Sequence, residues 1–592
     1  TDTVNKGRAS STAASNAVTI GAGEGKAVNV TLDNVTINVD EEPTSGYDPS
    51  AYKTAVSVTG SGNTNIELNG NNTLTSGYGH AGLEHNKTDD SGTLTIQDEK
   101  NDDGSAKGGA SDTTGSLTAN GGGLGAGIGG SSNKDGQVTI TGGKITATGG
   151  NGAAGIGGGA SDKYTAVGGD GDVTISGGTI TATGGSGAAG IGGGLDGNGT
   201  VIITDGDITA KARGYYGAGI GGGCGEIPKD TLIGGNGTVT ISGGTITEAS
   251  GGYMAAGIGS GYQGLGTVTI EGDAVIKNAQ GGEAGAGIGS GTYGDSEIII
   301  RGDAVIENAE SSANGAGIGS GQGDLYPDGD GMVIDLTVGN VTIEGNARIE
   351  NAKSGSGGSG IGGGAVGIGN VIIRGNAQIG NATGGDEGAG IGGGVLGTGD
   401  VTIEGNVTIE NAQGGAGAAG IGGGAETQPD TEDTRNKVSI KSTEAGSPNI
   451  TAKGGGVLNG GGVLDDNVSL PGAAAIGSGS VADGATEVTS DITMEGKVTI
   501  NATSGGDVAI GDSTNGETRF SGLQVGTTIT RRNAKGDDVS QPGDVPEPEK
   551  PAQPTVTPSE GAEAPSTGSV EVERPVTVEG LYVTNVLGKQ IT

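Results

Sequence analysis

The chain of 592 residues contains no tryptophan, one phenylalanine and one cysteine, Cys224. Without large aromatic side chains an ordinary globular core cannot be built, so small aliphatic residues must do the packing. A single cysteine excludes a disulfide within the chain. No apolar run is long enough to cross a bilayer as a helix, which predicts that the chain does not insert into membranes.

Positive charge is also scarce. The 30 lysines and arginines face 69 aspartates and glutamates, which gives a net charge of −39. Nucleic acids and anionic membranes bind basic surfaces, so neither is expected as a partner. An acidic surface fits an extracellular protein, or one that captures cations. The chain opens at Thr1 without a signal peptide, and we expect a mature or excised fragment.

Glycine, in contrast, is abundant, with 137 residues. The motif Gly-Ala-Gly-Ile-Gly-Gly first occurs in full at 125–130 and then returns through most of the chain, at intervals of 28 to 43 residues that are most often 30. Its isoleucine serves as a marker of each repeat. The markers are Ile128, Ile156, Ile191, Ile220, Ile258, Ile288, Ile318, Ile361, Ile391 and Ile421, with looser copies at Leu83, Ile476 and Ile510. Such a period indicates a repeat architecture.

One repeat contains three short extended segments, at 268–270, 275–279 and 285–289, each followed by a Gly-rich turn. The segments are too short for helices and alternate small aliphatic with polar residues or glycine. Strands of this kind can stack on their counterparts in the next repeat. The sequence therefore predicts an all-β fold, a right-handed parallel β-helix with three short strands per coil and about a dozen coils. The handedness follows from the rule for parallel crossovers.

The regularity of the repeats predicts the domain organisation. Insertions in the regular array enter between a marker and the next first strand, and that edge of a solenoid often carries binding loops. The longest insertion follows Ile318. We expect a flexible lead-in at 1–17, irregular capping coils at 18–116, a regular β-helix array at 117–424, irregular closing coils at 425–532, a Pro-rich acidic linker at 533–568 and part of a further β module at 569–592.

Stacked coils should align like residues in columns along the axis, about 4.8 Å apart. One column should hydrogen-bond through its amide side chains. Its members are Asn278, Asn308, Asn351, Asn381 and Asn411. A second column alternates in charge. Its members are Glu271, Arg301, Glu344, Arg374 and Glu404.

The glycine-rich third segment allows two interpretations. In Ala286-Gly287-Ile288, strand alternation places alanine and isoleucine on one face and the glycines on the other. If alanine and isoleucine fill the core, the outer face is bare and could receive a ligand or another backbone. Alternatively, glycine only allows tight corners in a thin solenoid.

Tyrosines border this third segment, four to eight residues from a marker. A phenol ring can stack on the apolar face of a sugar while its hydroxyl bonds to sugar hydroxyls. Covering a loop is the alternative role for each of them. The candidate ligand-binding residues are Tyr164, Tyr215, Tyr216, Tyr253, Tyr262, Tyr293 and Tyr326.

Metal and catalytic signals are weaker. Asp324, Asp328 and Asp330 could gather oxygen ligands for calcium, although their spacing is that of neither an EF-hand nor a nine-residue calcium repeat. His80 and His85 lie five residues apart, where we expect an exposed polar turn rather than a metal site. No nucleophile and base stand in a recognisable pattern, so an enzyme is not expected.

A resemblance to a known family rests on Leu-Asp-Asn-Val-Thr-Ile at 32–37, Ile-Glu-Leu-Asn-Gly at 66–70, Gly-Thr-Leu-Thr-Ile at 92–96 and the Ala-Gly-Ile-Gly-Gly-Gly repeats. These resemble the right-handed β-helical carbohydrate-binding domains of large surface proteins from Gram-positive, often gut-dwelling bacteria. Their fold is similar to that of polysaccharide lyases.

The resemblance implies an extracellular, adhesin-like module at a bacterial cell surface that binds a glycan or another repeating polymer without catalysis. Two alternatives remain open at this point. One is a stalk or filament element that self-associates through its glycine faces. The other is a lyase for acidic glycans, which would require a basic groove or a calcium cluster.

Overall fold

The computed structural model describes residues 17–39, 52–99, 115–161, 168–225, 235–328, 331–426, 435–459, 469–481, 490–511 and 518–540. The chain divides into two compact units, Thr1–Pro546 and Glu547–Thr592. The second unit lies outside the described residues, as do nearly all of the predicted lead-in and the predicted linker from 541 onward. The described residues contain 48 strands and no helix.

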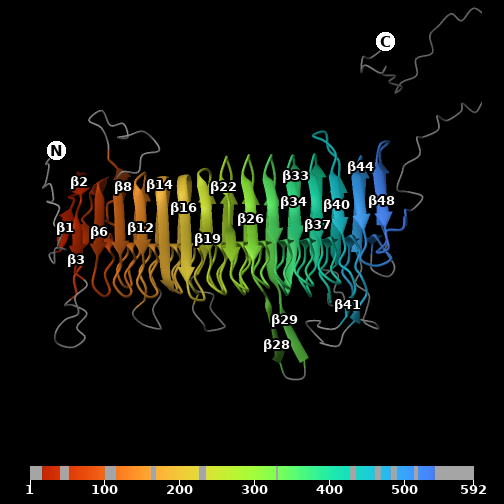
Figure 1. The fold of residues 1–592 in the computed structure, drawn as a ribbon, viewed down its shortest axis with the longest axis horizontal. Helices are drawn as coiled ribbons and strands as arrows, with labels where there is room; N and C mark the ends of the chain where they lie inside the picture. Colours follow the sequence, from red (N-terminus) through yellow and green to blue (C-terminus); the bar gives the residue numbers. More distant parts are fainter. Residues whose placement is uncertain are drawn as a thin grey trace, which may run out of the picture. The chain divides into compact units, whose positions relative to one another are not determined.

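The first unit is an all-β solenoid, a parallel β-helix, as predicted (Figure 1). The first and second strands of the coils form one 29-stranded sheet, and the third strands form a separate 15-stranded sheet. Strands of the predicted capping and closing coils join the same two sheets, so one continuous stack of fifteen coils replaces the dozen that we expected.

The strands fall into three columns. The third strands are β1 (Val18–Gly21), β4 (Val56–Thr59), β7 (Leu83–Glu84), β10 (Ile128–Gly129), β13 (Ile156–Gly157), β15 (Ile191–Gly192), β17 (Ile220–Gly221), β20 (Ile258–Gly259), β24 (Ile288–Gly289), β27 (Ile318–Gly319), β32 (Ile361–Gly362), β35 (Ile391–Gly392), β38 (Ile421–Gly422), β43 (Ile476–Gly477) and β46 (Ile510–Gly511). The first strands are β2 (Ala27–Asp33), β5 (Asn63–Asn69), β8 (Leu94–Asp98), β11 (Gly136–Ile140), β18 (Gly237–Ile241), β21 (Gly266–Ile270), β25 (Ser296–Ile300), β30 (Thr337–Ile343), β33 (Gly367–Gly375), β36 (Gly399–Gly405), β39 (Asn436–Lys441), β44 (Ser490–Gly496) and β47 (Thr518–Leu523). The second strands are β3 (Thr36–Asn38), β6 (Asn71–Thr75), β9 (Ser116–Asn120), β12 (Lys144–Thr148), β19 (Thr245–Ser250), β22 (Val275–Ile276) with β23 (Ala279–Gly281), β26 (Val305–Ser311), β31 (Arg348–Lys353), β34 (Gln378–Thr383), β37 (Thr408–Gln413), β40 (Asn449–Lys453), β45 (Thr499–Thr503) and β48 (Thr528–Arg532). In two coils the first and second strands merge, as β14 (Gly171–Ser186) and β16 (Gly199–Arg213).

The main core is one continuous cluster of aliphatic side chains that runs along the stack. Neighbouring coils pair in parallel and in register, so that Ile270 of β21 lies beside Ile300 of β25 and Ile288 of β24 beside Ile318 of β27. Each of these isoleucines is fully buried. Burying one such side chain contributes about 1.5–3 kcal/mol, which explains how a chain without large aromatics can fold.

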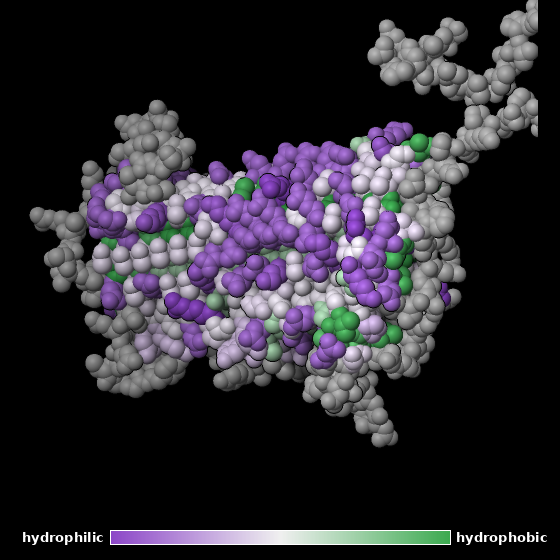
Figure 2. Space-filling view, turned by 45° about the vertical axis from the view of Figure 1, so that its right-hand side comes forward, coloured by the Kyte–Doolittle hydropathy of each residue, from purple (hydrophilic) through white to green (hydrophobic). Residues whose placement is uncertain are grey.

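The two predicted columns are confirmed. Within the asparagine column, the amide of Asn351 donates to Asn308 Oδ1 and that of Asn381 to Asn351 Oδ1, both at 3.1 Å. Within the charge column, Arg301 bonds to Glu271 and Arg374 to Glu344, each with an Nε to Oε2 distance of 2.7 Å. Figure 2 shows that one face of the stack is largely hydrophilic.

Two hairpins leave the stack. The insertion after Ile318 forms an antiparallel hairpin of β28 (Asp324–Asp328) and β29 (Gly331–Asp335), which projects from one edge (Figure 1). The shorter β41 (Leu458–Asn459) and β42 (Ser469–Leu470) lie between a second and a third strand.

Candidate ligand-binding edge

The glycines of the third strands are buried, so these strands have no bare outer face. A Cβ atom at Gly287 would lie 2.5 Å from the backbone nitrogen of Glu310 and 2.6 Å from the carbonyl oxygen of Gly317. A Cβ atom at Gly289 would lie 1.9 Å from the carbonyl oxygen of Gly319. Glycine is therefore required here because the backbones of neighbouring coils approach closely, a role that neither of the two interpretations described.

In each coil one loop precedes the third strand and another follows it, and these loops cover the third strands. The loop that follows the third strand of one coil hydrogen-bonds to the loop that precedes the third strand of the preceding coil. Tyr262 N donates to Tyr216 O at 3.0 Å, and Thr292 N donates to Met254 O at 2.9 Å. Because these contacts repeat from coil to coil, the glycine faces are not available for packing against another molecule. The predicted self-association through them has no surface to use.

The assignment of alanine to the core also changes. Ala286 is fully buried but lies outside the continuous core cluster. At the position of Gly287, the two last coils carry Ala475 and Ala509, and both belong to that cluster. The glycine column thus faces the core, and the alanine column lies beneath the covering loops.

A glycine follows the marker isoleucine in each coil from β10 onward, and its backbone angle explains why. The φ values of these glycines lie between 128° and 146°, with Gly289 at 139°. Side chains of L-residues are strained in this region, where a non-glycine residue costs about 1–3 kcal/mol.

Five of the predicted tyrosines come together in one chain of ring contacts. The ring centroids of Tyr215 and Tyr253 lie 5.8 Å apart, those of Tyr215 and Tyr216 5.9 Å, those of Tyr216 and Tyr262 5.3 Å, and those of Tyr262 and Tyr293 5.6 Å. These distances are typical of favourable aromatic pairs. The cluster extends over three coils, on the edge from which the insertions leave.

The structure divides these tyrosines by exposure. Tyr215 is 58% exposed and Tyr253 42%, whereas Tyr262 is only 8% exposed. Burial raises the pKa of Tyr262 to about 12. Tyr262 therefore supports the cluster and has little surface for a ligand, contrary to its place among the predicted binding residues. The exposed pair is the part that a ligand can reach.

Carboxylates border the cluster. The hydroxyl of Tyr253 donates to Glu283, which raises the pKa of Tyr253. The pKa of Tyr293 is raised by burial first, and then by the charge of Asp324 and the hydrogen bond to it. Asp324 also accepts a bond from Leu325 N at 2.9 Å.

The remaining predicted site residues are less informative. Tyr326 lies half-buried on β28. Asp328 pairs through its backbone with Gly331, but its side chain lies outside the described residues, as do Tyr164 and Asp330. The calcium site therefore stays a prediction. Among the described residues, no three histidine, cysteine or acidic side chains gather closely enough to hold a metal.

A groove that sequence reasoning missed lies beside the hairpin. It has a volume of about 180 Å³, and its lining residues are Asn314, Gln322, Leu325, Ser356, Gly357, Ala365, Val366, Asp386, Glu387 and Val395. Asn314 Nδ2 donates to Gln322 Oε1 at 3.0 Å. The residues come from three coils and the hairpin, so no local sequence motif predicts the groove.

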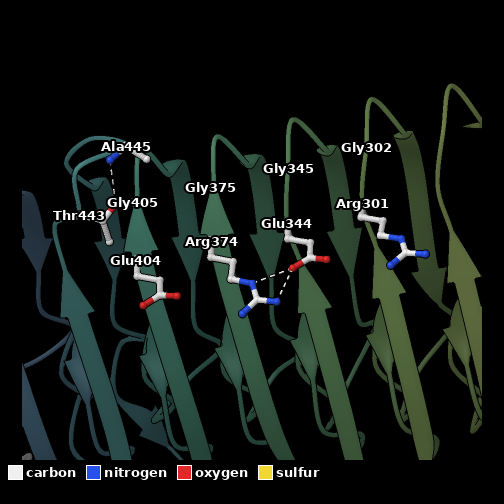
Figure 3. Close-up of a pocket in the computed structure, with 10 residues that line it drawn as sticks. All are labelled: Arg301, Gly302, Glu344, Gly345, Arg374, Gly375, Glu404, Gly405, Thr443 and Ala445. Carbon is white, nitrogen blue, oxygen red and sulfur yellow. Dashed lines mark hydrogen bonds and ion pairs between the residues drawn. The ribbon is translucent and has the colours of Figure 1, made fainter.

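A second, shallower groove of about 400 Å³ follows the charge column (Figure 3). Arg374 Nη2 and Glu344 Oε2 lie 2.5 Å apart, as do Arg301 Nη2 and Glu271 Oε2. The alternation of charge continues beyond Glu404, because Glu404 pairs in register with Lys441. The Nζ atom of Lys441 lies 3.1 Å from a glutamate of the next coil. The arginines here are neutralised by their neighbours, so the groove is not basic.

The two histidines do not form an exposed turn, contrary to the prediction. His85 is only 2% exposed, and its Nδ1 lies 2.9 Å from the carbonyl oxygen of Gln137. Burial lowers the pKa of His85, although backbone bonds to Gln137 and Gly92 oppose this. His80 instead bonds through Nδ1 to Glu84 Oε2 at 2.8 Å.

The fold defines a protein class, the parallel β-helix solenoids. A family model described as a beta helix repeat matches four consecutive segments, at 138–160, 173–195, 201–224 and 239–262. Each segment runs from a first strand through the following third strand, so the model and the structure agree on the repeat. Comparison with curated proteins and with solved structures gives no match.

Proposed function

We propose that this chain is a non-catalytic, extracellular glycan-binding module of a bacterial surface protein. The observation that carries the proposal is the exposed pair Tyr215 and Tyr253, whose ring centroids lie 5.8 Å apart on adjacent coils. Two exposed aromatic rings on a rigid scaffold offer apolar area to sugar rings with little loss of conformational freedom.

The polar groups around this pair favour an uncharged sugar. Glu283 holds the hydroxyl of Tyr253, and Asp324 that of Tyr293. Carboxylates accept hydrogen bonds from sugar hydroxyls, but they repel uronic acids and sulfated sugars. The net charge of −39 acts in the same direction.

The ion pairs of the charge column support binding without catalysis. A lyase for acidic glycans requires unpaired cationic groups to neutralise its substrate. Arg301 and Arg374 are each engaged by a glutamate of the neighbouring coil. We therefore place neither a substrate nor a reaction in that groove.

The test compares the full chain with the double variant Tyr215→Ala/Tyr253→Ala on an array of neutral glycans (β-glucan, mannan, galactan and xylan). Removing an aromatic anchor costs about 2 kcal/mol, which corresponds to roughly thirtyfold weaker binding. Ile202→Ala is the matched control, because Ile202 is 41% exposed in the same coil but lies in the other sheet. Equal retention of all three proteins, or retention of none, would contradict the proposal.

A further inference from the structure

In each coil, the residue five positions before the marker lies in the loop that precedes the third strand. Because the third strands pair in register, these positions form a row parallel to the axis of the stack. From the third coil to the ninth they are Tyr78, Gly123, Asn151, Ser186, Tyr215, Tyr253 and Glu283. The ring contact of Tyr215 with Tyr253, and the bond from Tyr253 to Glu283, show that neighbours in the row touch.

A second aromatic pair stands at the N-terminal end of this row. The ring centroids of Tyr52 and Tyr78 lie 5.7 Å apart, and both residues are half-buried. The ring of Tyr78 lies over Gly123, where a Cβ atom would come within 2.7 Å of Tyr78 Cδ2. The missing side chain at Gly123 therefore makes room for the ring.

Polar side chains accompany this pair as they do the first. Thr54 Oγ1 lies 2.8 Å from His80 Nδ1, and His80 Nδ1 lies 2.8 Å from Glu84 Oε2. The imidazole itself stays 31% exposed. Glu84 directly follows its marker, at the position where later coils have glycine. Its partner in β10 is Gly129.

We propose that Tyr52 and Tyr78 form a second sugar-binding site, and that one extended glycan chain runs along the row to Tyr215 and Tyr253. The inference rests on the proposed function. Four coil spacings separate Tyr78 from Tyr215, which is about 19 Å. The exposed side chains between the two pairs, Asn151 and Ser186, are small and polar. These two side chains offer hydrogen bonds to sugar hydroxyls and, among the residues that the structure describes in this row, put no bulky group in the path.

A polymer that reaches both sites gains affinity because its second contact is intramolecular. The experiment is calorimetric titration of the full chain with the neutral glycans that the array retains. Each glycan is used as oligosaccharides shorter and longer than the separation of the two pairs. We expect two short oligosaccharides per chain, one long one per chain, and at least about a hundredfold tighter binding of the long one.

The variants separate this inference from the proposed function. Tyr78→Ala should reduce the stoichiometry for short oligosaccharides to one and remove the gain with length, whereas Tyr78→Phe should retain both. If short oligosaccharides bind at one site per chain and Tyr78→Ala does not change this binding, the second site is refuted and the proposed function still stands. Absence of binding to every glycan tested would overturn both. Unfolding temperatures of the variants show whether a loss reflects misfolding.

Discussion

Replacing Gly289 by alanine tests the role of glycine in the third strand. The φ angle of Gly289 is 139°, which costs a non-glycine residue about 1–3 kcal/mol. In addition, the new Cβ atom would lie 1.9 Å from the carbonyl oxygen of Gly319. Relief of such a clash by backbone shifts costs about 1–3 kcal/mol. The two effects together predict a destabilisation of about 2–6 kcal/mol.

The damage should be local, because each coil of a solenoid contacts only its neighbours. Hydrogen exchange measured by mass spectrometry is the suitable assay, since a long repeat array need not unfold as one unit. Peptides that cover β24 and β27 should exchange at least about thirtyfold faster in Gly289→Ala, the factor that 2 kcal/mol implies. Peptides from β5 and β8 should be unchanged.

Gly456→Ala is the matched control. Gly456 is exposed, its φ is not positive, and a Cβ atom there would meet nothing within 4 Å. An alanine at such a position stabilises by about 0.4–1 kcal/mol, because it restricts the unfolded chain. If Gly289→Ala exchanged no faster than Gly456→Ala around β24, close backbone approach would be refuted as the reason for the glycine column.

Three further predictions concern single side chains. His85 is neutral in the folded chain and has its pKa below the ordinary 6.5, so the unfolded state binds more protons as the pH falls. Stability should be full above about pH 6.5 and decline below it, and melting temperatures of His85→Gln should show a smaller decline. Asn381→Ala removes the bonds to Asn351 at 3.1 Å and from Asn411 at 3.4 Å, and hydrogen exchange of peptides that cover β31, β34 and β37 should show a local loss of about 1–3 kcal/mol. Tyr262→Phe should abolish a phenol ionisation near pH 12 in a spectrophotometric titration, and an unchanged titration curve would contradict the burial of that ring.

The repeat itself was predictable from the sequence because its cause is local. Isoleucine and valine recur at every second residue in short segments that end at turns, and like segments that recur at a nearly fixed spacing bury these residues when successive coils stack in parallel and in register. The same reasoning correctly places Asn351 beside Asn381 and Arg374 beside Glu344. The glycine that follows each marker was equally visible, although its φ angle was not.

Tertiary structure decided what is exposed. In the sequence Tyr253 and Tyr262 look alike, yet one is exposed and the other is buried where two loops meet over the third strand. The glycines that sequence alternation had placed on a bare face are packed against the backbone of the neighbouring coil, and the same loops cover the alanines instead. The tilted ring contact of Tyr52 with Tyr78 likewise depends on segments 26 residues apart. Such contacts depend on how the loops of neighbouring coils lie against one another, and the local sequence of each loop does not specify this arrangement.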